Sequence, residues 1–152
     1  KKIEILKYLK LKEEFKCNFL IIVIMPQTLV TLFNGHILEF IDDLCNIIEN
    51  SEELLNIKSK IKKVILISST KPIKLWKDSC SKYDIEIENK NYNFFLQKSY
   101  IQDVKNDNFL FTLFEKYKLQ FSKEKKENKE KIMQFIYNLH KISKMYYMSK
   151  TN

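Results

Sequence analysis

The sequence predicts an all-α fold, a compact bundle of about five helices with one irregular extended segment near residues 84–105. Apolar side chains recur at spacings of three and four residues along most of the chain, the pattern of amphipathic helices. The chain contains one glycine and two prolines, which disfavours a turn-rich β sandwich or barrel. With 152 residues, 45% of them hydrophobic, it is long enough for one domain with its own core.

The first methionine, Met25, divides the chain. A new sequence pattern begins there, so we interpret residues 1–24 as an N-terminal extension upstream of a native start, and residues 25–150 as a single helical domain. The alternative is that the sequence belongs to a longer protein. The apolar run 19–25 is shorter than the roughly 20 residues that cross a bilayer, so no membrane partner is expected.

Three helices are predicted in the first half of the chain. Apolar side chains at helical spacing place the first within residues 28–50. Ser51, which precedes two glutamates, is the expected N-cap of the second helix, and this helix ends at the polar break 68–70. Pro72 suits the first turn of the third. The apolar run 64–68 could form a strand, but its flanks are helical and no partner strand is evident.

Two more helices and one non-helical segment are predicted in the second half. Residues 84–105 first alternate in polarity and then carry aromatic side chains without a helical period, which predicts an extended connection. Asp107 is the expected start of the fourth helix. Ser122 is the expected N-cap of the last helix, whose lysine-rich beginning forms a charged, solvated first turn.

Aromatic side chains suggest two roles. Trp76 shares a helical stripe with Ile73, which predicts a core anchor between helices; an exposed interface anchor is the alternative. Phe94, Phe95 and Tyr100 lie in the segment expected to be extended, where they could dock on a protein partner. Internal packing of these three rings is the alternative.

Lysine supplies all of the positive charge: Lys and Arg together number 27, none of them Arg, and the formal net charge is +8. Because arginine is the main bidentate reader of guanine, sequence-specific duplex recognition is disfavoured and non-specific nucleic-acid contact stays open. If the last helix is continuous, Lys123, Lys126, Lys141 and Lys144 run along one outer face. Such a face suits an acidic protein partner or a phosphate backbone; a solvated surface is the alternative.

The side chains that most often carry chemistry form no recognisable motif. The sequence has no glycine-rich phosphate loop, no HExxH and no GxSxG. His36 and His140 flank apolar stripes, where half-buried packing histidines are common. Cys17, Cys45 and Cys80 are odd in number and widely spaced, which favours free thiols in a reducing compartment. No catalytic residue, metal site or cofactor is therefore expected.

Four short segments follow one another in a distinctive order. They are an FN-x-x-L-x-x-F-like opening, a proline before the third helix, an FFL-x-K-x-Y segment and an ENK-x-x-I ending. The matching residues are Phe33, Asn34, Ile37, Phe40, Pro72, Trp76, Phe94, Phe95, Leu96, Lys98, Tyr100, Glu127, Asn128, Lys129, Ile132 and Leu139. From Met25 to about Met148 this order resembles uncharacterised small helical proteins of the nucleocytoplasmic large DNA viruses, the giant-virus group.

The resemblance implies a viral gene product of the host cytoplasm or the virion, without enzymatic chemistry. Phe135 stands where Tyr or Trp is usual in that family. We expect a non-enzymatic structural or assembly protein, such as a virion or minor capsid component, that acts through protein–protein contacts. The alternatives are a helical module that binds host proteins and a non-specific nucleic-acid adaptor that uses the lysine face.

Overall fold

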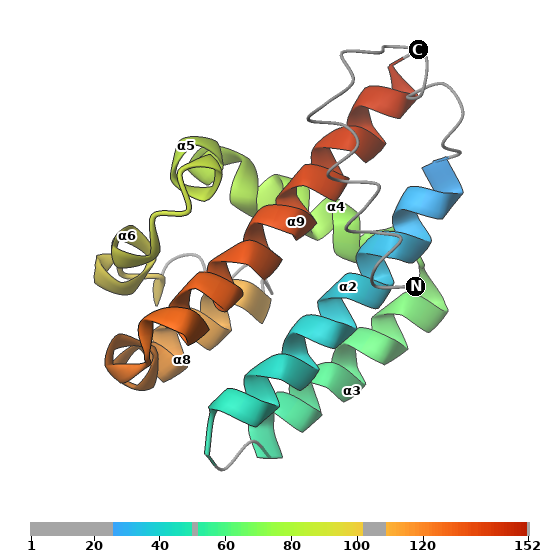
Figure 1. Cartoon of the computed structure of the whole chain (residues 1–152). Helices are drawn as coiled ribbons and strands as arrows, with labels where there is room; N and C mark the ends of the chain where they lie inside the picture. Colours follow the sequence, from blue (N-terminus) through green and yellow to red (C-terminus); the bar gives the residue numbers. More distant parts are fainter. Residues whose placement is uncertain (1–25, 50–51, 102–108, 152) are drawn as a thin grey trace.

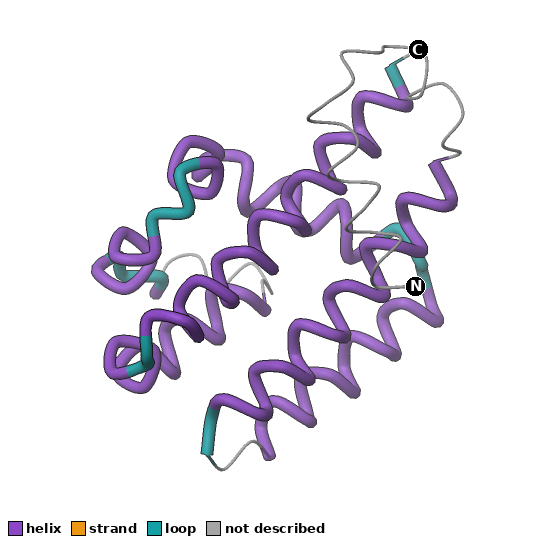
Figure 2. The backbone as a smooth tube through the Cα atoms, viewed as in Figure 1, coloured by secondary structure: helices purple, strands orange, loops and turns teal. Residues whose placement is uncertain are grey.

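The computed structural model describes residues 26–49, 52–101 and 109–151, and all regular structure within these ranges is helical (Figures 1 and 2). The elements are α2 (Pro26–Ile47), α3 (Glu52–Ile67), α4 (Lys71–Cys80), a 3₁₀ turn (Ser81–Tyr83), α5 (Asp84–Glu88), α6 (Tyr92–Gln97), α8 (Phe109–Lys123) and α9 (Lys126–Lys150). The predicted all-α bundle is confirmed. The predicted extension 1–24, the start Met25, the cap Ser51 and the helix start Asp107 lie outside the described residues.

Helix α9 crosses the middle of the molecule and packs along α2 (Figure 1). Phe135 of α9 stacks on Phe40 of α2 with ring centroids 5.2 Å apart. One turn further along α9, towards its beginning, the Lys131 ammonium lies 3.1 Å from the Asp43 carboxylate. Because residue numbers rise along α2 as they fall along α9, the two helices are antiparallel.

Helices α3 and α4 both pack against α2. Leu54 and Ile61 are the buried side chains of α3. The amide nitrogen of Asn34 on α2 donates to the Ser69 carbonyl at 2.8 Å, which fixes the turn between α3 and α4. The run 64–68 continues α3 as far as Ile67 and forms no strand.

Trp76 of α4 lies in the core, as predicted. Its side chain is 2% exposed and meets Phe33 of α2 edge-on, with ring centroids 5.8 Å apart. Pro72 occupies the first turn of α4, also as predicted, and Ile73 beside it is completely buried. The spacing of Ile73 and Trp76 places both on the face that α4 turns to α2 and α9.

The prediction of an extended segment over 84–105 is wrong for most of the part that the structure describes, residues 84–101. Residues Asp84–Glu88 and Tyr92–Gln97 are helical, joined through Lys90 with a φ of 50°. The Asn91 side-chain oxygen accepts the Phe94 backbone N–H at 3.1 Å and caps α6. These helices are too short for an apolar period to show in the sequence, and burial of rings such as Phe95 stabilises them.

Within residues 84–101, the backbone is extended just after α6, as expected. Lys98 adopts β geometry, and Tyr100 lies beyond it with a fully buried ring. The Tyr100 backbone N–H donates to the Glu115 carboxylate of α8 at 2.9 Å, and its hydroxyl donates to the Phe95 carbonyl at 2.9 Å. Residues 102–105 lie outside the described residues.

Ser122 is not the N-cap of the last helix. Helix α8 continues to Lys123, and the Ser122 hydroxyl donates back to the Leu119 carbonyl at 2.7 Å. The chain turns at Lys125, whose extended backbone (φ −61°, ψ 151°) precedes α9. A serine hydroxyl can either cap a following helix or donate to a carbonyl of its own helix, and Ser122 does the second.

Candidate functional site

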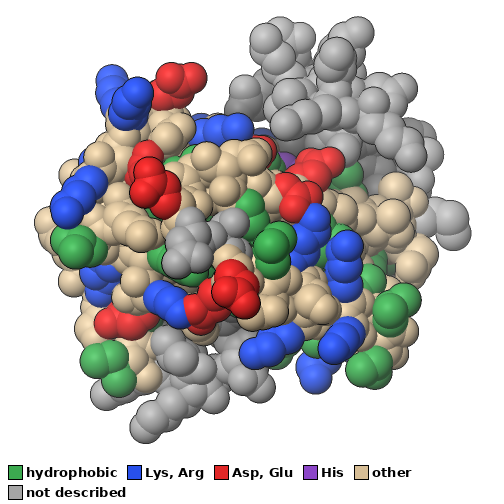
Figure 3. Space-filling view, turned by 90° about the horizontal axis from the view of Figure 1, so that it is seen from below, with side chains coloured by type: hydrophobic (Ala, Val, Ile, Leu, Met, Phe, Trp, Pro, Cys, Tyr) green, Lys and Arg blue, Asp and Glu red, His purple; other side chains and the backbone are tan. Residues whose placement is uncertain are grey.

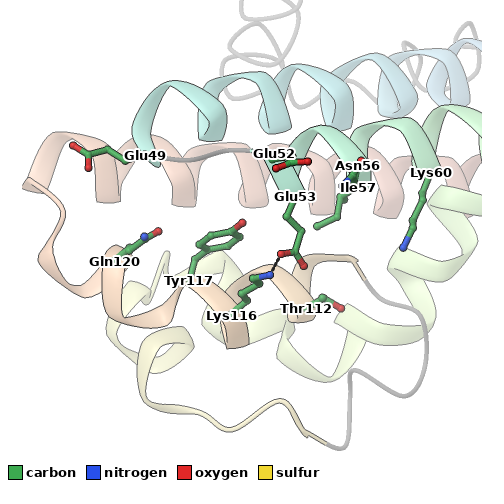
Figure 4. A pocket seen from close by; sticks show the side chains of 10 residues that line it. All are labelled: Glu49, Glu52, Glu53, Asn56, Ile57, Lys60, Thr112, Lys116, Tyr117 and Gln120. Carbon is green, nitrogen blue, oxygen red and sulfur yellow. Dashed lines mark ion pairs between the residues drawn. The ribbon is translucent and has the colours of Figure 1, made fainter.

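A groove of about 600 Å³ runs between the first half of α3 and the side of α8 (Figure 4). Glu49, just beyond α2, lies at one end and Lys60 of α3 lies at the other. Thr112 and Gln120 of α8 contribute polar side chains to the opposite wall. The groove exists because α3 and α8, far apart in the sequence, come to lie next to each other on the bundle.

Negative charge exceeds positive charge in this groove, although the chain as a whole is basic. Three glutamates and two lysines line it, a balance of −1. Glu53 and Lys116 form an ion pair across the groove. Within the described part of the chain, Glu49 and Glu52 have no ion-pair partner. The surplus carboxylates therefore remain available to a partner with basic side chains.

The groove also offers apolar surface. Ile57 of α3 is half-buried and Tyr117 of α8 is buried, and both line the groove. Burial raises the pKa of the Tyr117 phenol, so the phenol is neutral at ordinary pH. This combination of ring, aliphatic side chain and free carboxylates suits a segment of another protein.

The four predicted lysines do not form one continuous row. Lys123 ends α8, whereas Lys126, Lys141 and Lys144 belong to α9, so the break at Lys125 removes the premise of a continuous helix. The Lys126 ammonium lies 3.7 Å from the Glu130 carboxylate. The Lys141 ammonium lies over the Tyr137 ring at 5.4 Å.

Lys144 is engaged within the fold. Its ammonium lies 2.8 Å from the Asp84 carboxylate and 3.0 Å from the Glu88 carboxylate. These contacts raise the pKa of Lys144, chiefly through the hydrogen bond to Asp84. Two carboxylates thus surround one ammonium, and Lys144 is paired within the fold instead of standing free on the predicted face.

The predicted docking aromatics are mostly internal. Phe95 and Tyr100 are completely buried, so their assignment to a docking strip is wrong. Phe94 is half-buried and contacts Tyr83 at 5.9 Å between ring centroids. The short helix α6 turns its aromatic side toward α8, and this orientation was invisible to a sequence reading that expected an extended chain.

A chain of polar contacts connects the core to the surface at His140. The Trp76 indole N–H donates to His140 Nδ1 at 3.4 Å, and His140 Nε2 lies 2.6 Å from the Asp84 carboxylate. Because Nδ1 accepts, the proton of a neutral ring belongs on Nε2. His140 is 5% exposed, more deeply buried than the sequence indicated. With both ring nitrogens engaged, it joins α4, α5 and α9.

Acid should weaken this junction. Hydrogen bonds from Lys144 and then from His140 lower the pKa of Asp84. A carboxyl group with a lowered pKa stabilises the fold above its unfolded-chain pKa of about 3.9, and this stabilisation is lost as pH falls through the folded pKa. We expect Asp84→Asn to make stability depend less on pH below about 4.

Urea midpoints measured across the acid range test this expectation. Asp84 is 45% exposed at its side chain, so the difference should be modest. Some acid dependence should remain in the variant, because the Tyr100 backbone N–H lowers the pKa of Glu115 in the same way. Parallel curves for the wild type and Asp84→Asn would contradict the assignment.

The two described cysteines differ in burial, and Cys45 carries a free thiol. Cys80 is completely buried in the core, and Cys45 of α2 is half-buried. Cys17 lies outside the described residues. Among residues 26–49, 52–101 and 109–151, no group of three or more His, Cys, Asp or Glu side chains could hold a metal ion. No helix within these ranges is long and apolar enough to span a bilayer.

Comparison of the chain with models of known protein families, with curated proteins and with solved structures found no match. The resemblance of the four short segments therefore stays a prediction.

Sequence reasoning missed the groove. Glu52 and Glu53 lie in the first turn of α3, where carboxylates favour the helix dipole, and this placement alone does not indicate a groove. The groove depends on how α8 lies against α3, and no local pattern around Lys116 or Tyr117 signals that pairing. The three glutamates within residues 49–53 of a basic chain are the signal that could have drawn attention to it.

Proposed function

We propose that the chain is a non-enzymatic structural or assembly protein of a large DNA virus, and that it acts through protein–protein contacts at the groove between α3 and α8. The resemblance of the four segments supports the viral origin. The groove supports the mode of action, because it combines a volume of about 600 Å³ with free carboxylates and apolar side chains. A virion or minor capsid component would use it to hold a segment of a neighbouring protein.

The contents of the groove define the partner segment. The carboxylates of Glu49 and Glu52 would pair with lysine or arginine side chains, and Ile57 and Tyr117 would contact apolar ones. A helix with basic and apolar side chains on one face meets both requirements, as in other helix-in-groove complexes. Charge complementarity of this kind selects partners and fixes their register.

Charge reversal in the groove tests this function. We expect Glu49→Lys/Glu52→Lys to lower incorporation of the chain into virions roughly tenfold or more, because like charges at an interface cost several kcal/mol. The measurement is quantitative proteomics of purified particles produced with either form of the gene.

A matched control separates the groove from the effect of net charge. Asp78→Lys/Glu127→Lys makes the same change in charge at exposed positions away from the groove, and Glu127 lies in the first turn of α9 as Glu52 does in that of α3. Normal incorporation of this control is expected. Absence of the wild-type chain from purified particles would overturn the virion assignment. Groove-dependent binding to a host protein in that case would support a host-directed module.

A further inference from the structure

Helices α3 and α4 meet at a corner of the bundle, and the stretch of the chain that runs through them carries almost all of the surplus positive charge. Residues 54–77 contain seven lysines and no acidic residue, against a net charge of +8 for the whole chain. The lysines are Lys58, Lys60, Lys62, Lys63, Lys71, Lys74 and Lys77. In Figure 3, several lysine side chains gather at the lower right of the face shown, whereas both signs mix over the rest of that face.

Two large apolar side chains protrude from the same corner. Leu66 and Ile67, in the last turn of α3, are each 86% exposed, more than any other large hydrophobic side chain in the described residues. They are consecutive residues at the end of α3, and we refer to the two together as the apolar tip. Exposure of this tip to water is unfavourable, and contact with a partner would remove the two side chains from water.

Helix geometry places lysines directly beside the apolar tip. Lys62 and Lys63 precede Leu66 and Ile67 by four residues each, so the four side chains share the outer face of α3, opposite its buried face. Lys62 and Lys63 are exposed and have no ion-pair partner within the described part of the chain.

The first turn of α4 adds two more free lysines. Lys71 and Lys74 follow the tip directly after the turn 68–70, and both are exposed without an ion-pair partner in the described ranges. Lys58 and Lys77 differ, because Lys58 pairs with Asp42 and Lys77 lies over the Tyr147 ring at 3.9 Å. The free cations of the corner therefore flank the apolar tip on both sides.

We propose that this corner, made of Lys62, Lys63, Leu66, Ile67, Lys71 and Lys74, docks on the surface of an anionic phospholipid bilayer. The apolar tip enters the interface between headgroups and acyl chains, and the lysines remain at the level of the anionic headgroups, with their aliphatic stems against the membrane. Such a contact lies at the interface, so it needs no spanning helix. The expectation of no membrane partner was based on span length alone.

The apolar tip favours a bilayer over a nucleic acid. A phosphate backbone attracts lysines, but it gives no reason for Leu66 and Ile67 to project between them. A bilayer uses both features at once. The proposed contact is also separate from the groove, because Leu66 and Ile67 end α3 whereas Glu52 begins it.

Vesicle flotation with the full chain tests the proposal. We expect the chain to float with phosphatidylcholine vesicles that contain phosphatidylserine, to stay behind with pure phosphatidylcholine vesicles, and to detach as salt is added. Lys62→Gln/Lys63→Gln should weaken binding roughly 30-fold, since each lysine near an anionic surface contributes about fivefold. Leu66→Gln/Ile67→Gln should weaken it by about tenfold or more.

Glutamine preserves helix propensity, and circular dichroism verifies that each variant is folded. Lys123→Gln/Lys125→Gln removes the same charge from exposed positions at the other end of the bundle, and its binding should stay close to that of the wild type. Failure of the wild type to bind anionic vesicles at low salt would overturn the proposal. So would vesicle binding that does not depend on Leu66 and Ile67. Retention of a duplex oligonucleotide without vesicle binding would assign the corner to nucleic acid instead.

Discussion

Trp76→Ala is expected to lower the free energy of unfolding by about 3–5 kcal/mol, a large part of the stability of a domain of this size. The side chain is 2% exposed and packs edge-on against Phe33, so its removal leaves a cavity where α4 meets α2. It also removes the indole N–H that donates to His140 Nδ1. Because Trp76 is the single tryptophan of the chain, unfolding is best followed by circular dichroism in urea.

Two further variants divide this effect into its parts. Trp76→Phe keeps a ring in the core but leaves the buried His140 nitrogen without its donor, and a lost partner of this kind costs about 1–3 kcal/mol. Lys74→Ala, at an exposed position of the same helix, should change stability little. A urea midpoint for Trp76→Ala equal to that of the wild type would reject the core assignment.

The long helices could be predicted because their cores are periodic. Phe33, Ile37 and Phe40 occur at helical spacing and are all buried on α2, and the same rule places Ile73 and Trp76 on the inner face of α4. Each of these elements is long enough for its stripe to stand out. Each apolar stripe also predicts that another helix packs against that side, and the bundle provides one.

The short helices could not be predicted in this way. Helices of five and six residues, as in α5 and α6, contain too few turns to display a period. Isolated segments of that length are not stable in water, so contacts with the rest of the bundle decide their conformation. In α5, Ile87 is fully buried whereas Ile85 is 71% exposed, and this difference becomes meaningful only once α9 is in place.

The prediction of one continuous lysine face was wrong because of the break between α8 and α9. It assumed that the helix containing Lys126 extends back through Lys123, and the break at Lys125 separates the two. It also took no account of contacts with other elements, whereas Lys144 pairs with Asp84 and Glu88 of α5. The angular positions of residues around one helix do not show which of them form ion pairs with helices distant in the sequence.

Phe95→Ala should destabilise the fold by about 3–5 kcal/mol. Phe95 is completely buried, and its ring lies 5.7 Å from that of Phe114 and 6.1 Å from that of Tyr83. It therefore fixes α6 on α8 and on the turn after α4. A residue of a docking strip would behave differently, because its loss would weaken a complex and leave the isolated chain stable.

Phe94 provides a control from the same helix. Its ring is half-buried, so Phe94→Ala should cost about half as much as Phe95→Ala or less. Urea denaturation of both variants, followed by circular dichroism, compares two identical substitutions that differ only in burial. The backbone amides of α6 should also exchange slowly with solvent deuterium in the wild type and faster in Phe95→Ala, because packing of this ring keeps the short helix closed. Equal and small losses of stability for the two substitutions would show that α6 is not part of the core and would restore the docking role of its aromatic side chains.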